Sequence, residues 1–99
     1  MCTSILESAT LAGSAKGARG WFRVDRANVG YDHPFHANLD HALTIDLVDE
    51  TGIDQRVAVE LTIDAARELA AAILAAVEQA EAYEGLEAPP ARGLATPVR

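Results

Sequence analysis

Two segments in the middle of the chain alternate regularly between apolar and polar positions. HALTIDLV, residues 41–48, carries on one parity His41, Leu43, Ile45 and Leu47. RVAVELTI, residues 56–63, carries on one parity Val57, Val59, Leu61 and Ile63. Because successive side chains of a strand point to opposite faces, this alternation predicts two half-buried strands. The intervening DETGIDQ contains Gly52 and predicts a hairpin loop.

The N-terminal half predicts two further extended segments. TSILESATL, residues 3–11, is rich in β-branched and apolar residues, and GSAKGARG, residues 13–20, holds three glycines and is typical of a loop. In WFRVDRANVGY, residues 21–31, the apolar positions change parity between Val24 and Ala27. We therefore expect a second strand that is bent or split near Asp25 and Arg26.

The pattern changes to helical spacing after Thr62, a good N-cap residue. The apolar stripe consists of Ala66, Leu69, Ala70, Ile73, Val77 and Ala80. The helix is expected to stop at Gly85. The other helix faces are rich in alanine, which indicates either high helix propensity or a surface for a partner helix. The segment 86–99, with three prolines and little apolar content, predicts a disordered tail.

These elements predict a single α+β domain over residues 1–85. In it, an antiparallel sheet of about four strands packs on one long C-terminal helix. Because one helix covers only one face of a sheet, the bare face or an edge strand is expected to make the protein a homo-oligomer.

Composition narrows the possible partners. The formal charge is -7, and the eight basic residues are scattered along the chain, which argues against nucleic acid as a partner. No apolar run approaches the roughly 20 residues of a membrane span, and no signal peptide is expected. The single cysteine allows no internal disulfide, so we expect a cytoplasmic protein.

All three histidines lie within nine residues, in the segment YDHPFHANLDHAL. A turn around Pro34 could bring His33 and His36 together, and His41 enters the next strand on its apolar parity. Neutral imidazoles are ligands of zinc, copper, iron and nickel, so the cluster predicts a transition-metal site with Asp32 or Asp40 in support. Alternatively, the histidines only pack beside aromatic residues or cap the turn.

Cys2 is a candidate fourth ligand. Removal of Met1 before a small residue would leave an N-terminal cysteine, whose amine and thiolate could chelate a metal. The alternative is an inert thiol at a frayed end.

Lys16 and Trp21 are candidate substrate-binding residues. Lys16, the only lysine, lies in the glycine-rich segment and could hold an anionic small molecule that Trp21 walls. A solvated lysine and a tryptophan that closes the core are the alternatives.

MCT, GSAKGARGWF, DHPFHANLDHALTIDL and VAVELTIDAARELAAAI together resemble a family of small, mainly actinobacterial proteins known as a domain of unknown function. The resemblance covers roughly residues 1–83 and implies no activity. From the residues themselves we expect a small metalloprotein, a metal-dependent enzyme that acts on a small molecule. The alternative is a non-catalytic protein-interaction module without metal.

Overall fold

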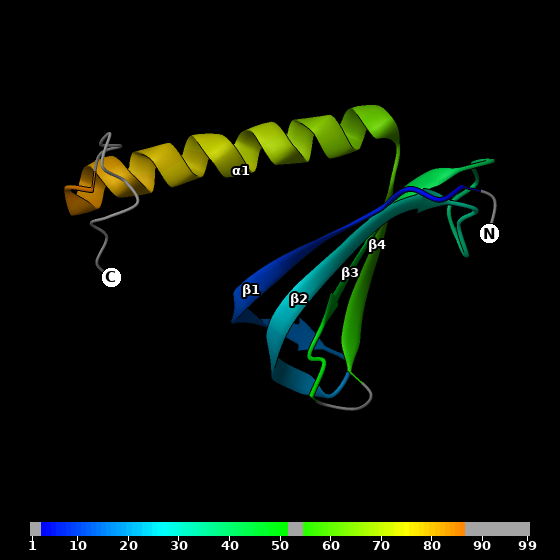
Figure 1. The fold of residues 1–99 in the computed structure, drawn as a ribbon, viewed down its shortest axis with the longest axis horizontal. Helices are drawn as coiled ribbons and strands as arrows, with labels where there is room; N and C mark the ends of the chain where they lie inside the picture. Colours follow the sequence, from blue (N-terminus) through cyan, green and yellow to red (C-terminus); the bar gives the residue numbers. More distant parts are fainter. Residues whose placement is uncertain (1–2, 52–54, 87–99) are drawn as a thin grey trace. The chain divides into compact units, whose positions relative to one another are not determined.

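The computed structural model describes residues 3–51 and 55–86, and within them it has four strands and one helix (Figure 1). These are β1 (Leu6–Gly17), β2 (Gly20–Asp32), β3 (Ala42–Val48), β4 (Arg56–Leu61) and α1 (Ile63–Glu84). The prediction of an α+β chain with a four-stranded antiparallel sheet and one C-terminal helix is confirmed. The chain divides into two units, residues 1–66 and 67–99, each of which we describe by itself. Packing of the helix on the sheet, within one domain, stays a prediction. The expected Gly52 loop and the tail from residue 87 lie outside the described residues.

The sheet has the order β1-β2-β3-β4, with every neighbouring pair antiparallel. Its registers align three apolar rows across β2, β3 and β4: Tyr31–Leu43–Leu61, Val29–Ile45–Val59 and Ala27–Leu47–Val57. The alternate rows are largely polar: Gly30–Thr44–Glu60, Asn28–Asp46–Ala58 and Arg26–Val48–Arg56. The sheet therefore has one apolar and one polar face, as the alternation in β3 and β4 predicts.

The prediction that residues 13–20 form a loop is wrong, because β1 continues to Gly17 and only Ala18 and Arg19 form the turn. The partner strand explains the difference. A Cβ atom on Gly17 would lie 3.1 Å from Cε1 of Phe22, so the glycine leaves room for the ring beside the β1 backbone. Gly20, with φ of 105°, adopts a backbone conformation at the turn that other residues rarely reach.

The expected irregularity near Asp25 and Arg26 exists, but β2 is one continuous strand and is not split. The pairing shifts between Thr10 and Gly13 of β1, which lie opposite Arg26 and Val24. The extra residue is thus in β1, whereas the parity change of the apolar residues in β2 gave no indication of which strand carries it.

The buried apolar residues of the described chain are few and small. Val24, Ala27 and Ala42 have exposed fractions of 4%, 8% and 0%. The apolar rows of β3 and β4 are half-buried. Such a thin core makes the chain sensitive to any change of volume at these positions.

Both ends of α1 are capped as the sequence predicts. The side-chain hydroxyl of Thr62 accepts a 3.0 Å hydrogen bond from the N–H of Ala65. At the other end Gly85 has φ of 80°, and its N–H donates to the carbonyl of Ala82 while that of Leu86 donates to the carbonyl of Glu81. These two bonds form a Schellman motif, which ends the helix at Glu84.

Candidate functional site

The histidine segment forms the connection between β2 and β3, and Glu60 of β4 anchors it. The Glu60 carboxylate accepts hydrogen bonds from three successive backbone N–H groups, those of Phe35 at 2.6 Å, His36 at 3.0 Å and Ala37 at 2.8 Å. Glu60 lies on the polar face of the sheet, in the row of Gly30 and Thr44. The loop is therefore tied across that face by one side chain.

These bonds make Glu60 a stronger acid than an ordinary glutamate. Hydrogen bonds from the N–H groups of Ala37 and Phe35 lower the pKa of the Glu60 carboxyl, and partial burial opposes them only in part. The N–H group and the positive charge of His36 lower the pKa further. The anchor is accordingly charged near neutral pH, which is the state that accepts all three bonds.

Two of the three histidines are brought together in a stack of rings. The imidazoles of His33 and His41 have centroids 4.9 Å apart and planes inclined by 22°. The phenol ring of Tyr31 also stacks on His41, with a distance of 5.5 Å between the ring centroids. His41 is half-buried, whereas His33 is exposed. The half-buried ring of His41 thus contacts two other rings, those of Tyr31 and His33.

The tautomer of His33 follows from its hydrogen bond. Its Nδ1 atom lies 3.1 Å from the backbone carbonyl oxygen of Asp40, which can only accept. Nδ1 must therefore carry the proton, and in the neutral ring Nε2 keeps its lone pair. Ligating histidines commonly have this arrangement, in which the second nitrogen donates to a carbonyl.

His36 is held differently. Its backbone is bound to Glu60, and its charge acts on that carboxylate. Within residues 3–51 and 55–86, no three His, Cys, Asp or Glu side chains are gathered as a metal site. The structure therefore does not group His36 with His33 and His41, and a three-histidine ligand set stays a prediction.

The segment before β1 lies at the end of the sheet where β2 and β3 are connected (Figure 1). The side-chain hydroxyl of Thr3 donates a hydrogen bond to the carbonyl of Tyr31, whose ring stacks on His41. Cys2 itself lies outside the described residues. Its role as a ligand stays a prediction.

Lys16 and Trp21 lie at the other end of β2. They face each other across the β1–β2 hairpin, and both side chains are exposed, Trp21 to 68%. Tyr31 is ten positions farther along the same strand. The structure does not bring Lys16 and Trp21 close to the histidines. Substrate binding by these two residues stays a prediction, and they do not share a site with the histidine pair.

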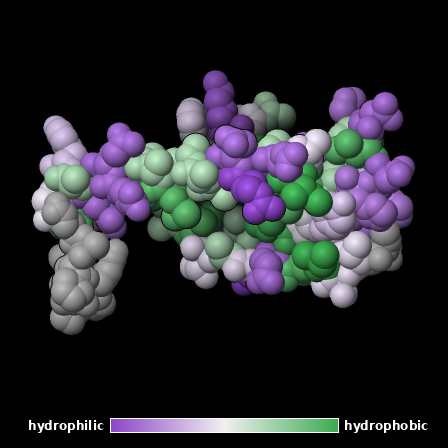
Figure 2. All heavy atoms as spheres, turned by 90° about the horizontal axis from the view of Figure 1, so that it is seen from above, coloured by the Kyte–Doolittle hydropathy of each residue, from purple (hydrophilic) through white to green (hydrophobic). Residues whose placement is uncertain are grey.

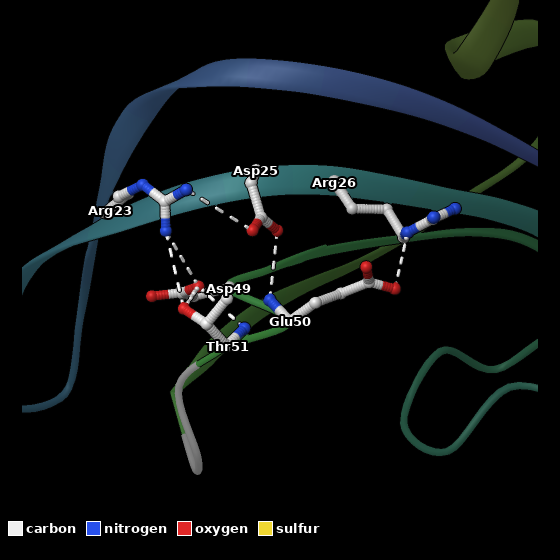
Figure 3. Close-up of polar contacts among 6 residues, drawn as sticks. All are labelled: Arg23, Asp25, Arg26, Asp49, Glu50 and Thr51. Carbon is white, nitrogen blue, oxygen red and sulfur yellow. Dashed lines mark hydrogen bonds and ion pairs between the residues drawn. The ribbon is translucent and has the colours of Figure 1, made fainter.

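The opposite end of the β2–β3 hairpin carries a network of paired charges (Figure 3). Arg23 lies 3.1 Å from an oxygen of Asp49, and Arg26 lies 2.6 Å from an oxygen of Glu50. Asp25 accepts the backbone N–H of Glu50 at 2.9 Å. These contacts join the first half of β2 to the residues that follow β3, which is a structural role.

Comparison with known families agrees with the resemblance seen in the sequence. A family described as "Family of unknown function (DUF6295)" matches residues 1–87. The chain belongs to DUF6295. No curated protein and no solved structure matches it. The function of this DUF6295 protein must therefore be argued from its site.

The described helix is not a membrane span. α1 is not apolar enough over a sufficient length to cross a bilayer.

Sequence reasoning identified the histidine segment but missed Glu60 and Tyr31. Glu60 is a polar position in an alternating strand, which is where any exposed residue is expected. Only the register, with Glu60 opposite Thr44, shows that its carboxylate lies under the loop. Tyr31 is the last of the alternating apolar residues Ala27, Val29 and Tyr31, and it lies two residues before His33. This position beside the histidine segment is the signal by which the sequence could have identified it.

Proposed function

We propose that this DUF6295 protein is a small metalloprotein, an enzyme that uses a divalent transition metal to act on a small molecule. The observation that carries the proposal is the His33–His41 pair, with rings 4.9 Å apart and Nδ1 of His33 engaged by the Asp40 carbonyl. Zinc, copper, iron and nickel all accept imidazole ligands. A bound ion would supply Lewis-acid activation or oxygen chemistry.

The chain's own residues prepare this site in three ways. The Asp40 carbonyl orients His33 so that Nε2 is the ligating atom. Tyr31 backs the ring of His41, and Glu60 holds the loop that follows His33. Because the two imidazoles are nearly parallel, binding to one ion requires them to turn about χ2, which the exposed position of His33 permits.

Further ligands must complete such a site. Among the described residues only a pair of imidazoles is assembled, and a catalytic zinc usually has three protein ligands. Thr3 donates a hydrogen bond to the carbonyl of Tyr31, whose ring stacks on His41. Because Cys2 precedes Thr3 in the chain, we assign the next ligand to Cys2. A second copy of the chain could also supply a ligand, because the thin core leads us to expect a homo-oligomer.

Metal uptake tests the proposal. Untagged protein is titrated with Zn²⁺ or Co²⁺, and we expect uptake that His33→Ala and His41→Ala abolish. His36→Ala is the matched control from the same loop, and it should retain most of the binding. Uptake below about a tenth of an equivalent by the unaltered protein would contradict the proposal.

Cys2 has a separate test. Mass spectrometry should show a mature chain without Met1, and Cys2→Ser should weaken Co²⁺ binding and remove the thiolate charge-transfer band. Retention of Met1, or an unchanged spectrum in the variant, would exclude the thiolate–amine ligand.

A second candidate is a protein-interaction module without metal. No residue of α1 is buried, and Leu69, Ile73, Leu74 and Val77 have exposed fractions of 42–64%. Hydrophobic residues also lie at the surface of the sheet unit (Figure 2). A homo-oligomer would cover such surface, and light scattering should then give at least twice the 10.5 kDa of one chain. A monomer at micromolar concentration would contradict this.

We further propose that the protein works in the cytoplasm and is of actinobacterial origin. The lone cysteine supports the compartment, and the four sequence motifs named above support the origin.

A further inference from the structure

An open pocket of about 400 Å³ lies on the polar face of the sheet, where the histidine loop meets β4. Its lining consists of Phe35, His36, Ala37, Arg56, Ala58 and Glu60. The three β4 residues alternate along the strand and thus share one face, and the loop residues are those bound by Glu60. The pocket is therefore preformed, and its volume suits a small molecule.

Arg56 begins β4, in the row of Arg26 and Val48, and its guanidinium group is incompletely paired. Its Nε atom lies 3.7 Å from Asp46, which is longer than a hydrogen bond, and its side chain is 54% exposed. Within the described residues we find no hydrogen bond of its guanidinium group. Arg23, by comparison, donates a 3.1 Å hydrogen bond to Asp49. The planar fork of Arg56 is thus available to a carboxylate or phosphate.

The nearest lining carboxylate does not compete for this fork. Both oxygens of Glu60 are engaged by the backbone N–H groups of the loop. Asp46 remains at its longer distance, as the partner that an external anion would replace.

The loop supplies an aromatic wall. Phe35 is 94% exposed, although an aromatic side chain gains much free energy from burial. Across the pocket, Ala58 is small and exposed, which leaves room for a flat group. A planar ring between Phe35 and β4 would bury apolar surface on both sides.

We propose that this pocket binds a small planar molecule with an anionic group, such as an aromatic carboxylate. Its ring lies against Phe35 and Ala58, and its anionic group pairs with the Arg56 guanidinium. The site is independent of the proposed metal site, because none of these contacts involves His33 or His41.

Benzoate is the probe. We titrate it into the ¹⁵N-labelled full chain and expect saturable amide shifts at Ala58, Phe35 and His36. Arg56→Gln should weaken binding at least about tenfold, because a bidentate charged contact is lost. Arg56→Lys keeps the charge without the planar fork and should be intermediate. Phe35→Ala should weaken binding as well, whereas Arg67→Gln, a matched arginine on α1, should bind as the unaltered protein does.

Three results would overturn the proposal. They are the absence of saturable shifts up to about 10 mM benzoate, equal binding by folded Arg56→Gln or Arg56→Lys protein, and equal shifts with benzyl alcohol, which lacks the charge. Inorganic phosphate carries charge but no ring. If it binds as tightly as benzoate, the proposal that the ligand needs an aromatic ring is wrong.

Discussion

The two ends of the β2–β3 hairpin are both polar, but they differ in what their polar groups contact. At the Arg23 end, arginines and carboxylates form ion pairs, with the closest contacts at 3.1 and 2.6 Å. At the loop end, the carboxylate of Glu60 accepts hydrogen bonds from backbone N–H groups. The imidazoles of His33 and His41 stack on each other.

This difference in contacts distinguishes polar groups that stabilise the fold from polar groups that can bind a ligand. Groups that satisfy each other hold two segments together and have little left for a ligand. At the loop end, Nε2 of His33 keeps its lone pair when Nδ1 donates to the Asp40 carbonyl, and the pocket beside the loop extends along β4 to the incompletely paired guanidinium of Arg56. We therefore place the function of the protein at the loop end.

Replacement of the loop anchor should have the largest effect. In Glu60→Gln the amide nitrogen or oxygen must face each N–H group of Phe35, His36 and Ala37, and an NH₂ group cannot accept. At least one of these N–H groups then loses its partner, and the loop detaches. Amide exchange of the three residues should become markedly faster. The control is Glu50→Gln, which loses an ion pair at the other end and should leave this exchange unchanged. Slow exchange in both variants would show that Glu60 is not the anchor.

Overpacking next to the loop should have the second-largest effect. Ala42 has no exposed surface and follows His41 directly. Ala42→Leu should lower the free energy of unfolding by about 1–3 kcal/mol. Ala72→Leu, on exposed helix surface, should change it by less than about 0.5 kcal/mol. Urea unfolding measures both, and equal values would contradict the assignment of Ala42 to the core.

Acid should release the loop only on the acid side of the ordinary glutamate range, because the pKa of the Glu60 carboxyl is lowered. The Glu60 pKa is lower in the folded chain than in the unfolded chain, so its contribution to stability is fully present above the ordinary glutamate pKa. The contribution is lost as the pH falls through the lowered value. An NMR titration of the Phe35 and Ala37 amides should show a midpoint on the acid side of the ordinary glutamate range. A midpoint at or above the ordinary value would contradict the hydrogen bonds.

The Arg23–Asp49 pair should contribute least. Its side chains are 62% and 19% exposed, and a largely exposed ion pair stabilises by about 0.2–1 kcal/mol. A double-mutant cycle with Arg23→Ala and Asp49→Ala should give a coupling in this range that decreases with added salt. A larger, salt-independent coupling would mean that this end is more than a surface network.

How far the sequence predicts the molecule depends on whether a feature is local. Alternation in residues 43–48 and 56–61 and the caps at Thr62 and Gly85 are local signals, and they predict the elements correctly. The glycine-rich segment misleads because strand pairing with Phe22, a contact between strands, overrides local composition. Glu60 is invisible for the same reason, since its contacts are 23 to 25 residues away in the chain.

Metal binding by the histidine pair is tested most directly on the imidazole nitrogens themselves. Long-range ¹H–¹⁵N spectra of the unaltered protein should show His33 protonated on Nδ1, because this atom donates to the Asp40 carbonyl. On titration with Zn²⁺, Nε2 of His33 and one nitrogen of His41 should shift together and saturate, while Nδ1 of His33 stays protonated. His33 with its proton on Nε2, or imidazole signals that do not move with Zn²⁺, would contradict the account.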